Sequence, residues 1–259
     1  MKPCTHKALT AHALTLLSKK LSPSFREFTQ EIINGSGAED NWWELSRSLN
    51  WHFYRSNVRM KRKYHIFHVS SELILEKRVA VFLDAGKPLS MRLFYLGRIL
   101  HHIQDMSTPS HVIPIYHGPA FPREFSLGVI PDYLEDFLEE HLSLIGDLKF
   151  HENKQYDFKT FPRIYAHSAE HMLHEVLKVD DEASFYANFW CYHTCAEDAK
   201  FKGFGTYGKY HTYFKQLPVE ETDISQEMLL EIAQMVLSHA VDYTCYALLV
   251  ADDIIGKNS

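Results

Sequence analysis

The chain has 259 residues, of which 46% are hydrophobic and 23% are charged, a composition typical of a folded protein with a sizeable core. Its net charge of −6, with histidine counted as neutral, argues against tight binding to nucleic acid or to anionic membranes. No apolar run reaches the roughly 18 residues of a membrane-spanning helix, so we do not expect an integral membrane protein.

Apolar residues recur at helical spacing along most of the chain, whereas the alternation typical of strands is scarce. No Gly/Ser-rich or Pro-rich linker divides the sequence. We therefore expect an all-α fold, a single compact multi-helix domain over residues 1–259. The spacing predicts helices at 5–20, 23–33 (ending before Gly35), 40–52, 70–85, 88–106, 132–148, 162–178, 182–200 and 222–255, with an irregular proline-rich segment at 107–131 and a loop at 203–208.

The N-terminal stretch MKPCTHKALTAHALTLL is not typical of a signal peptide, because histidine and lysine interrupt its apolar positions and no cleavage site follows. We therefore expect a cytoplasmic protein, with secretion as the alternative if the sequence is that of a mature or trimmed chain or if export needs no N-terminal signal. Of the four cysteines, Cys191 and Cys195 are expected on one helical face as core thiols. A metal site that they share with His193 is the alternative.

The chain has 17 histidines, and the stretch LGRILHHIQDMSTPSH at 96–111 combines several of them with an aspartate. His101 and Asp105 are four residues apart and share a helical face. His111 follows after a turn at Pro109. Two imidazoles and a carboxylate in one region favour zinc, which binds such nitrogen and oxygen ligands; the alternative is a polar helix end with a hydrogen-bonded histidine.

Other potential metal ligands lie elsewhere in the sequence, at His6, Asp40, His52 and Glu135. Twelve residues of straight helix make three turns plus about 120°. Asp40 and His52 therefore need not share a face, and they converge only if the segment bends near Asp40.

Together, His6, Asp40, His52, the run FYLGRILHHIQDMSTPSH and YLEDFLEE resemble the zinc-dependent phospholipase C family. That family shares an all-helical fold and a trinuclear zinc site with the P1/S1 nucleases. The resemblance covers most of the chain in order, and its most specific part is the pattern LGxxxHxxxDxxxPxH at 96–111. It implies an all-α fold and up to three zinc ions per chain.

The resemblance also implies which residues bind the metals. Asp105 bridges two zinc ions, and Asp40 has a catalytic role in addition, because it orients or deprotonates the attacking water. The implied ligands are Asp40, His52, His101 and Asp105 for one zinc, His111 and Glu135 for a second, and His6, Asp105 and the backbone of the first residue for a third.

Two positions depart from the family pattern. The first residue is Met1 instead of tryptophan; its backbone is the expected ligand, with the Cys4 thiolate or a degenerate third site as alternatives. The family's histidine four residues before the glutamate is replaced here by Pro131, which has no metal-binding side chain. His117, in the same loop, is the expected substitute, with His171 or a weakened second site as alternatives.

Three zinc ions among these carboxylates leave a positive pocket suited to a phosphate diester. We therefore expect a metal-dependent phosphoric diester hydrolase, phospholipase C-like, that releases diglyceride and a phosphorylated headgroup. A P1-like nuclease or other small-phosphoester hydrolase is one alternative, and a catalytically impaired metal-binding protein is another. Phe53 and Arg55 are expected to contact the substrate, Arg55 through a phosphate. We expect a monomer that contacts membrane surfaces transiently and forms no stable nucleic-acid complex.

Overall fold

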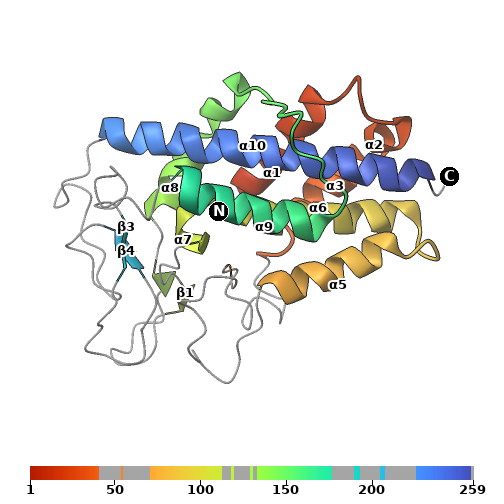
Figure 1. Ribbon diagram of the computed structural model, residues 1–259, viewed down its shortest axis with the longest axis horizontal. Coiled ribbons are helices and arrows are strands. Elements are labelled where there is room, and N and C mark those ends of the chain that lie inside the picture. The colour runs from red at the N-terminus through yellow and green to blue at the C-terminus, as the bar shows by residue number, and fades with distance from the viewer. Residues whose placement is uncertain are drawn as a thin grey trace.

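The computed structural model describes residues 1–40, 54, 71–112, 118–119, 129–130, 133–176, 190–192, 205–207 and 226–257. This part of the chain is mostly helical, which confirms the expected all-α character (Figure 1). No helix within these ranges is both long and apolar enough to cross a membrane. The helices are α1 (Pro3–Leu16), α2 (Pro23–Glu27), α3 (Thr29–Ser36), α5 (Ser71–Leu83), α6 (Leu89–Asp105), α7 (Pro109–Val112), α8 (Tyr133–Glu140), the 3₁₀-helix η2 (Leu142–Asp147), α9 (Phe161–His171), the π-helix η3 (Met172–Val176) and α10 (Gln226–Lys257).

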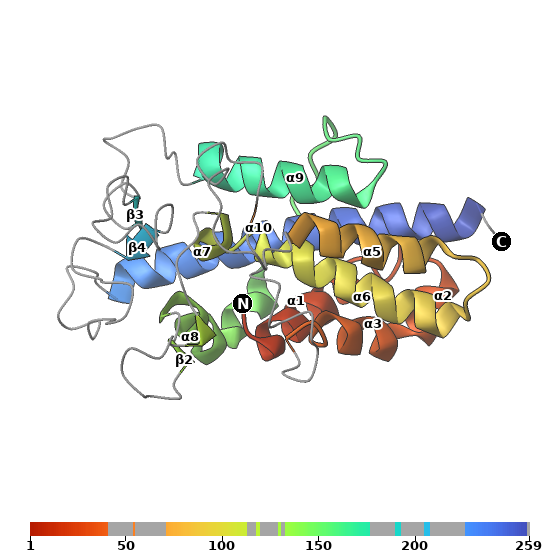
Figure 2. The same cartoon turned by 90° about the horizontal axis from the view of Figure 1, so that it is seen from below.

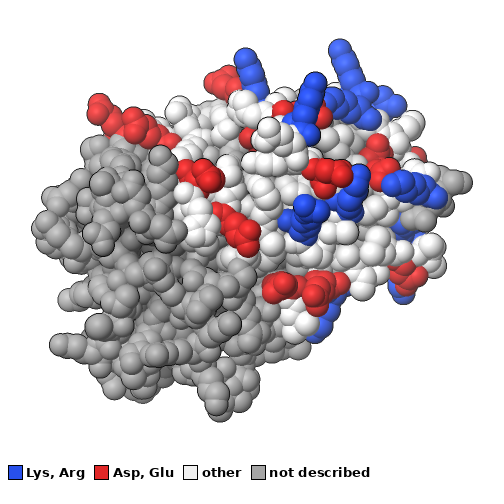
Figure 3. All heavy atoms as spheres, viewed as in Figure 1, with Lys and Arg blue, Asp and Glu red and all other residues white. Residues whose placement is uncertain are grey.

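The long helix α10 is the centre of the described fold, and α1, α6 and α9 pack against it (Figures 1 and 2). Ala233, Ala240 and Ala247 lie two turns apart along α10 and are fully buried. Their small side chains let neighbouring helices approach α10 closely. Charges of both signs lie over the described helices on the face in Figure 3.

Helices α3 and α6 cross at two glycines, Gly35 and Gly97. A Cβ atom on Gly35 would lie 2.0 Å from the carbonyl oxygen of Phe94, and one on Gly97 would lie 2.1 Å from that of Ile32. The prediction that Gly35 ends its helix is therefore wrong, because α3 continues to Ser36 and uses the glycine for close contact. The crossing fixes the end of α3 against the second half of α6.

The helix predicted at 23–33 is instead two helices, α2 and α3. The chain leaves helical geometry at Phe28, which has φ −106° and ψ 25°. The Thr29 hydroxyl donates a hydrogen bond to the carbonyl of Phe25 at 2.8 Å, and such bonds from threonine often bend helices.

The helix predicted at 182–200 is wrong at Trp190–Tyr192, which forms strand β3. This strand pairs in antiparallel fashion with β4 (Gly205–Tyr207), so the loop predicted at 203–208 is also wrong there. Aromatic residues favour strands, and Cys191 lies in β3 and not on a helical face shared with Cys195. The rest of 182–200 lies outside the described residues.

The proline-rich segment 107–131 contains more regular structure than expected. Helix α7 occupies Pro109–Val112, and β1 (Gly118–Pro119) pairs with β2 (Val129–Ile130). The turn between α6 and α7 brings His111 back towards the end of α6.

Candidate metal centre

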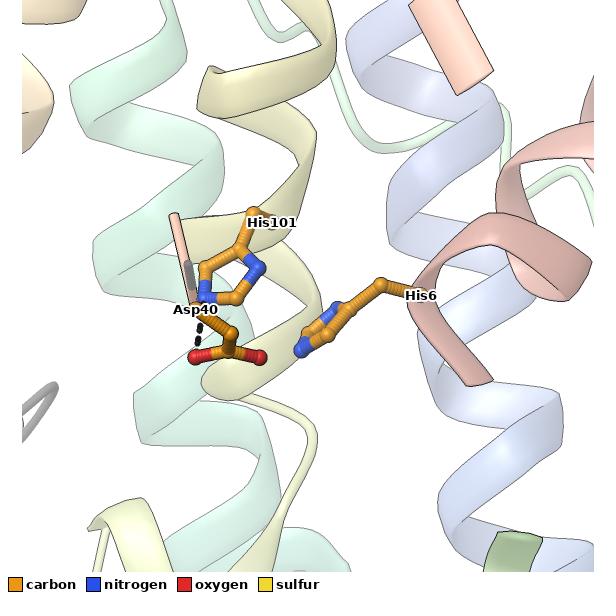
Figure 4. Close-up of side chains that lie close together, drawn as sticks. All are labelled: His6, Asp40 and His101. Carbon is orange, nitrogen blue, oxygen red and sulfur yellow. Dashed lines mark ion pairs between the residues drawn. The ribbon is translucent and has the colours of Figure 1, made fainter. Parts of the chain in front are cut away.

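Three side chains that are far apart in the sequence meet at the end of α6. His6 comes from α1, Asp40 from the turn after α3, and His101 from the last turn of α6 (Figure 4). One potential ligand atom from each lies within 4.8 Å of the other two. Asp105, one helical turn beyond His101, adds a carboxylate whose oxygens lie 3.4 Å from His6 Nε2 and 3.3 Å from His101 Nε2.

The orientation of His6 is fixed by Gln104 of α6. The Gln104 amide nitrogen donates to the hydroxyls of Thr10 and Thr244 at 3.0 and 3.1 Å. The amide oxygen therefore accepts from His6 Nδ1, at 2.7 Å. This leaves the Nε2 lone pair of His6 directed at Asp105, and that buried atom has no hydrogen-bond partner among the described residues.

His101 is held in the same manner by the backbone of α3. Its Nδ1 lies 2.9 Å from the carbonyl oxygen of Ser36, which can only accept, so Nδ1 carries the proton. Its Nε2 then faces Asp40, at 3.8 Å, and Asp105. A partner on the second ring nitrogen of this kind is the arrangement that proteins use to orient metal-binding histidines. Because the Ser36 carbonyl reaches His101 only through the close crossing at Gly35 and Gly97, helix packing sets the geometry of the site.

The amino group of Met1 lies in the same cluster. It is buried and lies 2.7 Å from Glu135 Oε1 and 3.3 Å from Asp105 Oδ1. Burial alone would lower its pKa, but Glu135, Asp105 and Asp40 outweigh that effect and raise the pKa to about 11. The Cys4 thiol, the rival ligand, donates instead to Glu139 at 2.9 Å, and its pKa is raised by burial and by that carboxylate.

His111 and Glu135 form the adjoining part of the cluster. His111 Nε2 lies 3.0 Å from Glu135 Oε1, and His111 Nδ1 lies 3.8 Å from Asp105 Oδ2. The backbone of His111 is also fixed, since its carbonyl accepts from the amide of Tyr54 at 3.0 Å. Asp105 therefore lies between His6, His101, His111 and the amino group of Met1.

The electrostatics of the cluster follow from burying charges beside one another. Burial lowers the pKa of His101, but Asp105 and Asp40 outweigh it and raise that pKa to about 9. The pKa of His6 falls to about 4, because the ring is buried and lies beside His101. Burial raises the pKa of Asp105, but His111, His101 and the N-terminus hold it well below its ordinary value. The group is thus a buried set of carboxylates that requires nearby positive charge.

Glu39 is a supporting residue that sequence reasoning missed. Its buried carboxylate accepts from Arg78 Nε and Arg98 Nε, both at 2.6 Å. Despite burial, the pKa of Glu39 is lowered by His102 and by these two arginines. The pairs tie the residue next to Asp40 to α5 and α6, and no local pattern reveals them because the partners are distant in sequence.

The structure brings together most of the expected ligands but does not describe all of them. His52, Phe53, Arg55, His117 and Pro131 lie outside the described residues. His171 lies in a different histidine group on α9. The expected ligands that the structure brings together are Met1, His6, Asp40, His101, Asp105, His111 and Glu135.

No protein-family model matches the chain, and a search of curated proteins gave no match.

Proposed function

We propose that this protein is a zinc-dependent phosphodiester hydrolase that resembles the phospholipases C. The observation that carries the proposal is the convergence of His6, Asp40 and His101 on one buried point beside Asp105. Both imidazoles direct Nε2 at that point, and both have Nδ1 committed to a hydrogen bond. Buried polar atoms in protein interiors normally have a hydrogen-bond partner. The buried Nε2 atom of His6 has none among the described residues, which favours a metal ligand over an ordinary core histidine.

The donor set fits zinc, which takes neutral imidazole nitrogens and carboxylate oxygens in small numbers. His6, His101, Asp40 and Asp105 would hold one or two ions, and Asp105 can bridge because its two oxygens face different histidines. His111, Glu135 and the amino group of Met1 would complete the adjoining position. Zinc held by these residues would lower the pKa of a coordinated water and offset the negative charge of a phosphate.

The two aspartates, Asp40 and Asp105, would have different roles in the reaction. The Asp40 side chain is 12% exposed to solvent, whereas that of Asp105 is 1% exposed. It is therefore the group that orients the attacking water or accepts its proton. Asp105 stays ionised because of its cationic neighbours, and it positions His6 and His101.

The second candidate is a metal-binding protein without catalytic activity. Its support is the complete burial of the His6 and His101 side chains, which is also typical of structural metal sites. A structural site would bind zinc and stabilise the fold, but it would not turn over any phosphodiester.

The test is hydrolysis of phosphatidylcholine vesicles and of single-stranded oligonucleotides by protein that is purified without chelator and loaded with zinc. We expect diglyceride release that stops after chelation and returns with zinc, and that is absent in Asp105→Asn. Mononucleotide release instead would identify the nuclease alternative. Zinc binding that raises the melting temperature without hydrolysis of either substrate would identify the non-catalytic one.

A further inference from the structure

A second group of histidines lies between α9 and α10, away from the ligands described above. The rings of His171 and His239 are stacked, with centroids 5.2 Å apart and an interplanar angle of 14°. His167, one turn before His171 on α9, has its ring centroid 6.1 Å from that of His171. The ring of Tyr243 lies against all three, with centroids between 4.5 and 6.1 Å away. We call the three imidazoles of His167, His171 and His239 the histidine stack.

The hydrogen-bond partners of the histidine stack are hydroxyl groups. His167 Nδ1 lies 2.6 Å from the Tyr243 hydroxyl, and His239 Nδ1 lies 2.8 Å from the Ser107 hydroxyl. Nδ1 of His171 and Nε2 of His239 are buried and have no hydrogen-bond partner among the described residues. Protonation of either ring would therefore leave a buried N–H group without an acceptor, in addition to burying a charge, and both are costly.

The charged side chains that act on the histidine stack are exposed to solvent, so water screens their effect. They are Arg163 and Glu170 on α9, which act on His167, and Glu175 on η3, which acts on His171. Among the described residues, α5, α6 and α10 also pack near α9 but contribute no carboxylate, lysine or arginine that acts on any of the three rings. The stack therefore has no buried carboxylate to balance a positive charge, in contrast to His101.

These surroundings favour neutral rings. Burial lowers the pKa of each of the three histidines below its ordinary value of 6.5, and neighbouring histidines lower those of His171 and His239 further. Below pH 6.5 the unfolded chain therefore binds protons that the folded stack excludes. The stability that the neutral stack provides is fully present above that pH and is lost progressively as the pH falls from there towards the folded pKa values.

The histidine stack joins elements that lead to the first cluster. Ser107, the partner of His239, lies in the turn between α6 and α7. The π-helix η3 continues directly from His171 and packs against α7. Helix α7 contains His111, so any movement of α9 and η3 away from α10 would remove packing from this helix.

We propose that the histidine stack is an acid-sensitive contact, which holds α9, η3 and the turn before α7 in place while its rings are neutral and releases them when the rings are protonated. The proposal does not depend on the proposed function, because it concerns only proton binding and helix packing. Release would nonetheless disturb the first cluster at His111.

Hydrogen exchange of the full-length protein, followed by mass spectrometry at pH 7.5 and pH 5.5, measures this release after correction for the intrinsic exchange rates. Over that range, each histidine that the folded state keeps neutral favours the open form by up to about tenfold. With three such histidines, we expect the protection of residues 161–176 to fall by more than about tenfold in the wild type. Protection at 107–112 should fall in parallel, while α3 keeps its protection.

The variant His171→Phe with His239→Asn tests whether the stack causes this fall. The phenyl ring can stack as the imidazole does, and the asparagine amide can still donate to the Ser107 hydroxyl, but neither side chain can take up a proton. We expect the fall at 161–176 to be about tenfold at most in this variant, whereas the control His174→Asn, at an exposed position on η3, should behave like the wild type. Equal falls in the wild type and the double variant, or an equal loss of protection in α3, would overturn the proposal.

A second measurement avoids substitutions altogether. In the wild-type protein labelled with ¹⁵N at histidine, long-range proton–nitrogen spectra report the protonation of each ring. We expect the signals of the histidine stack to remain those of neutral imidazoles below pH 6.5 and to change only as α9 loses its protection. Ordinary titration of all three rings near pH 6.5 with unchanged protection of α9 would contradict the proposal. Failure of the proposed function would appear instead as an absence of phosphodiester hydrolysis, which neither measurement involves.

Discussion

The two histidine clusters differ in what surrounds the imidazoles. At the end of α6, His101 has carboxylates on its open side, and its pKa rises to about 9. Between α9 and α10, His239 has a hydroxyl and other histidines around it, and its pKa falls. Burial lowers the pKa of both rings, so the carboxylates beside His101 account for the difference between them.

This difference separates what each cluster can do. Carboxylates balance the charge of several cations and can accept a proton, which hydrolysis requires. The group of neutral imidazoles and hydroxyls around His239 offers neither a balancing charge nor a base for water. The proposed hydrolysis is therefore expected at the first cluster.

The largest expected effect is on catalysis at the first cluster. Asp40→Asn should lower kcat by about 10²–10⁴-fold, because the amide cannot accept a proton from water. Hydrolysis of phosphatidylcholine by the zinc-loaded variant measures this, with Glu140→Gln on the exposed side of α8 as the control. Wild-type turnover by Asp40→Asn would remove the residue from the mechanism.

The next effect concerns the buried ion pairs of Glu39, the residue before Asp40. Glu39→Gln should lower the free energy of unfolding by about 3–5 kcal/mol, because it breaks the buried ion pairs of Glu39 with Arg78 and Arg98. Urea denaturation followed by circular dichroism measures the change. Glu152→Gln, which breaks an exposed pair with Lys20, should leave stability nearly unchanged. Equal effects of the two substitutions would show that the Glu39 pairs contribute no more than surface pairs.

A third prediction tests whether helix packing sets the site. Gly97→Ala should cost about 1–3 kcal/mol of stability, because its Cβ would lie 2.1 Å from the Ile32 carbonyl and would push α3 away. Zinc binding at the first cluster should weaken as well, because the Ser36 carbonyl that orients His101 would move with α3. The control is Gly256→Ala, which has open space around its Cβ. Unchanged zinc binding at the first cluster in Gly97→Ala would separate the crossing from the site.

A fourth prediction distinguishes the groups that hold each histidine. Gln104→Leu should weaken metal binding at the first cluster by about 10–100-fold, because His6 loses the partner of its Nδ1. Ser107→Ala, which removes the partner of His239 Nδ1 instead, should leave metal binding at the first cluster unchanged. Calorimetric titration with zinc separates the two. Equal weakening by the two substitutions would show that the hydrogen bond from Gln104 to His6 has no special role in metal binding.

The smallest expected effect lies away from both clusters, at Asp242. Burial raises its pKa above the ordinary value of 3.8, despite hydrogen bonds from His151. Between these two values the folded state keeps a proton that the unfolded state has lost. The resulting stability is therefore present at low pH and is lost as the pH rises through the folded pKa. Asp242→Asn should gain stability relative to wild type over that rise, as measured by urea unfolding at several pH values. A constant difference between the two proteins would contradict the raised pKa.

The sequence predicted the helices with strong apolar periodicity well. The helix expected at 88–106 is α6 at Leu89–Asp105, and that expected at 222–255 is α10. It failed at β3, where three residues read equally well as a helix or a strand. It also misread Gly35, because a glycine that permits a helix crossing has the same local signature as one that ends a helix.

For the site, the proximity of His101, Asp105 and His111 was predictable because these residues share one helix and one turn. The groups that orient them were not. Gln104 lies in the same helix but contacts Thr10 and Thr244, and the Ser36 carbonyl has no side chain to recognise. Such partners come from packing between distant elements, which a single sequence does not display.

The most direct test of the central claim is a crystal of the untagged protein grown with zinc and measured at the zinc absorption edge. The account predicts an anomalous peak within bonding distance of Nε2 of both His6 and His101 and of an oxygen of Asp105. A map without a peak there, in a crystal that contains zinc elsewhere, would contradict the claim that these residues form a metal centre.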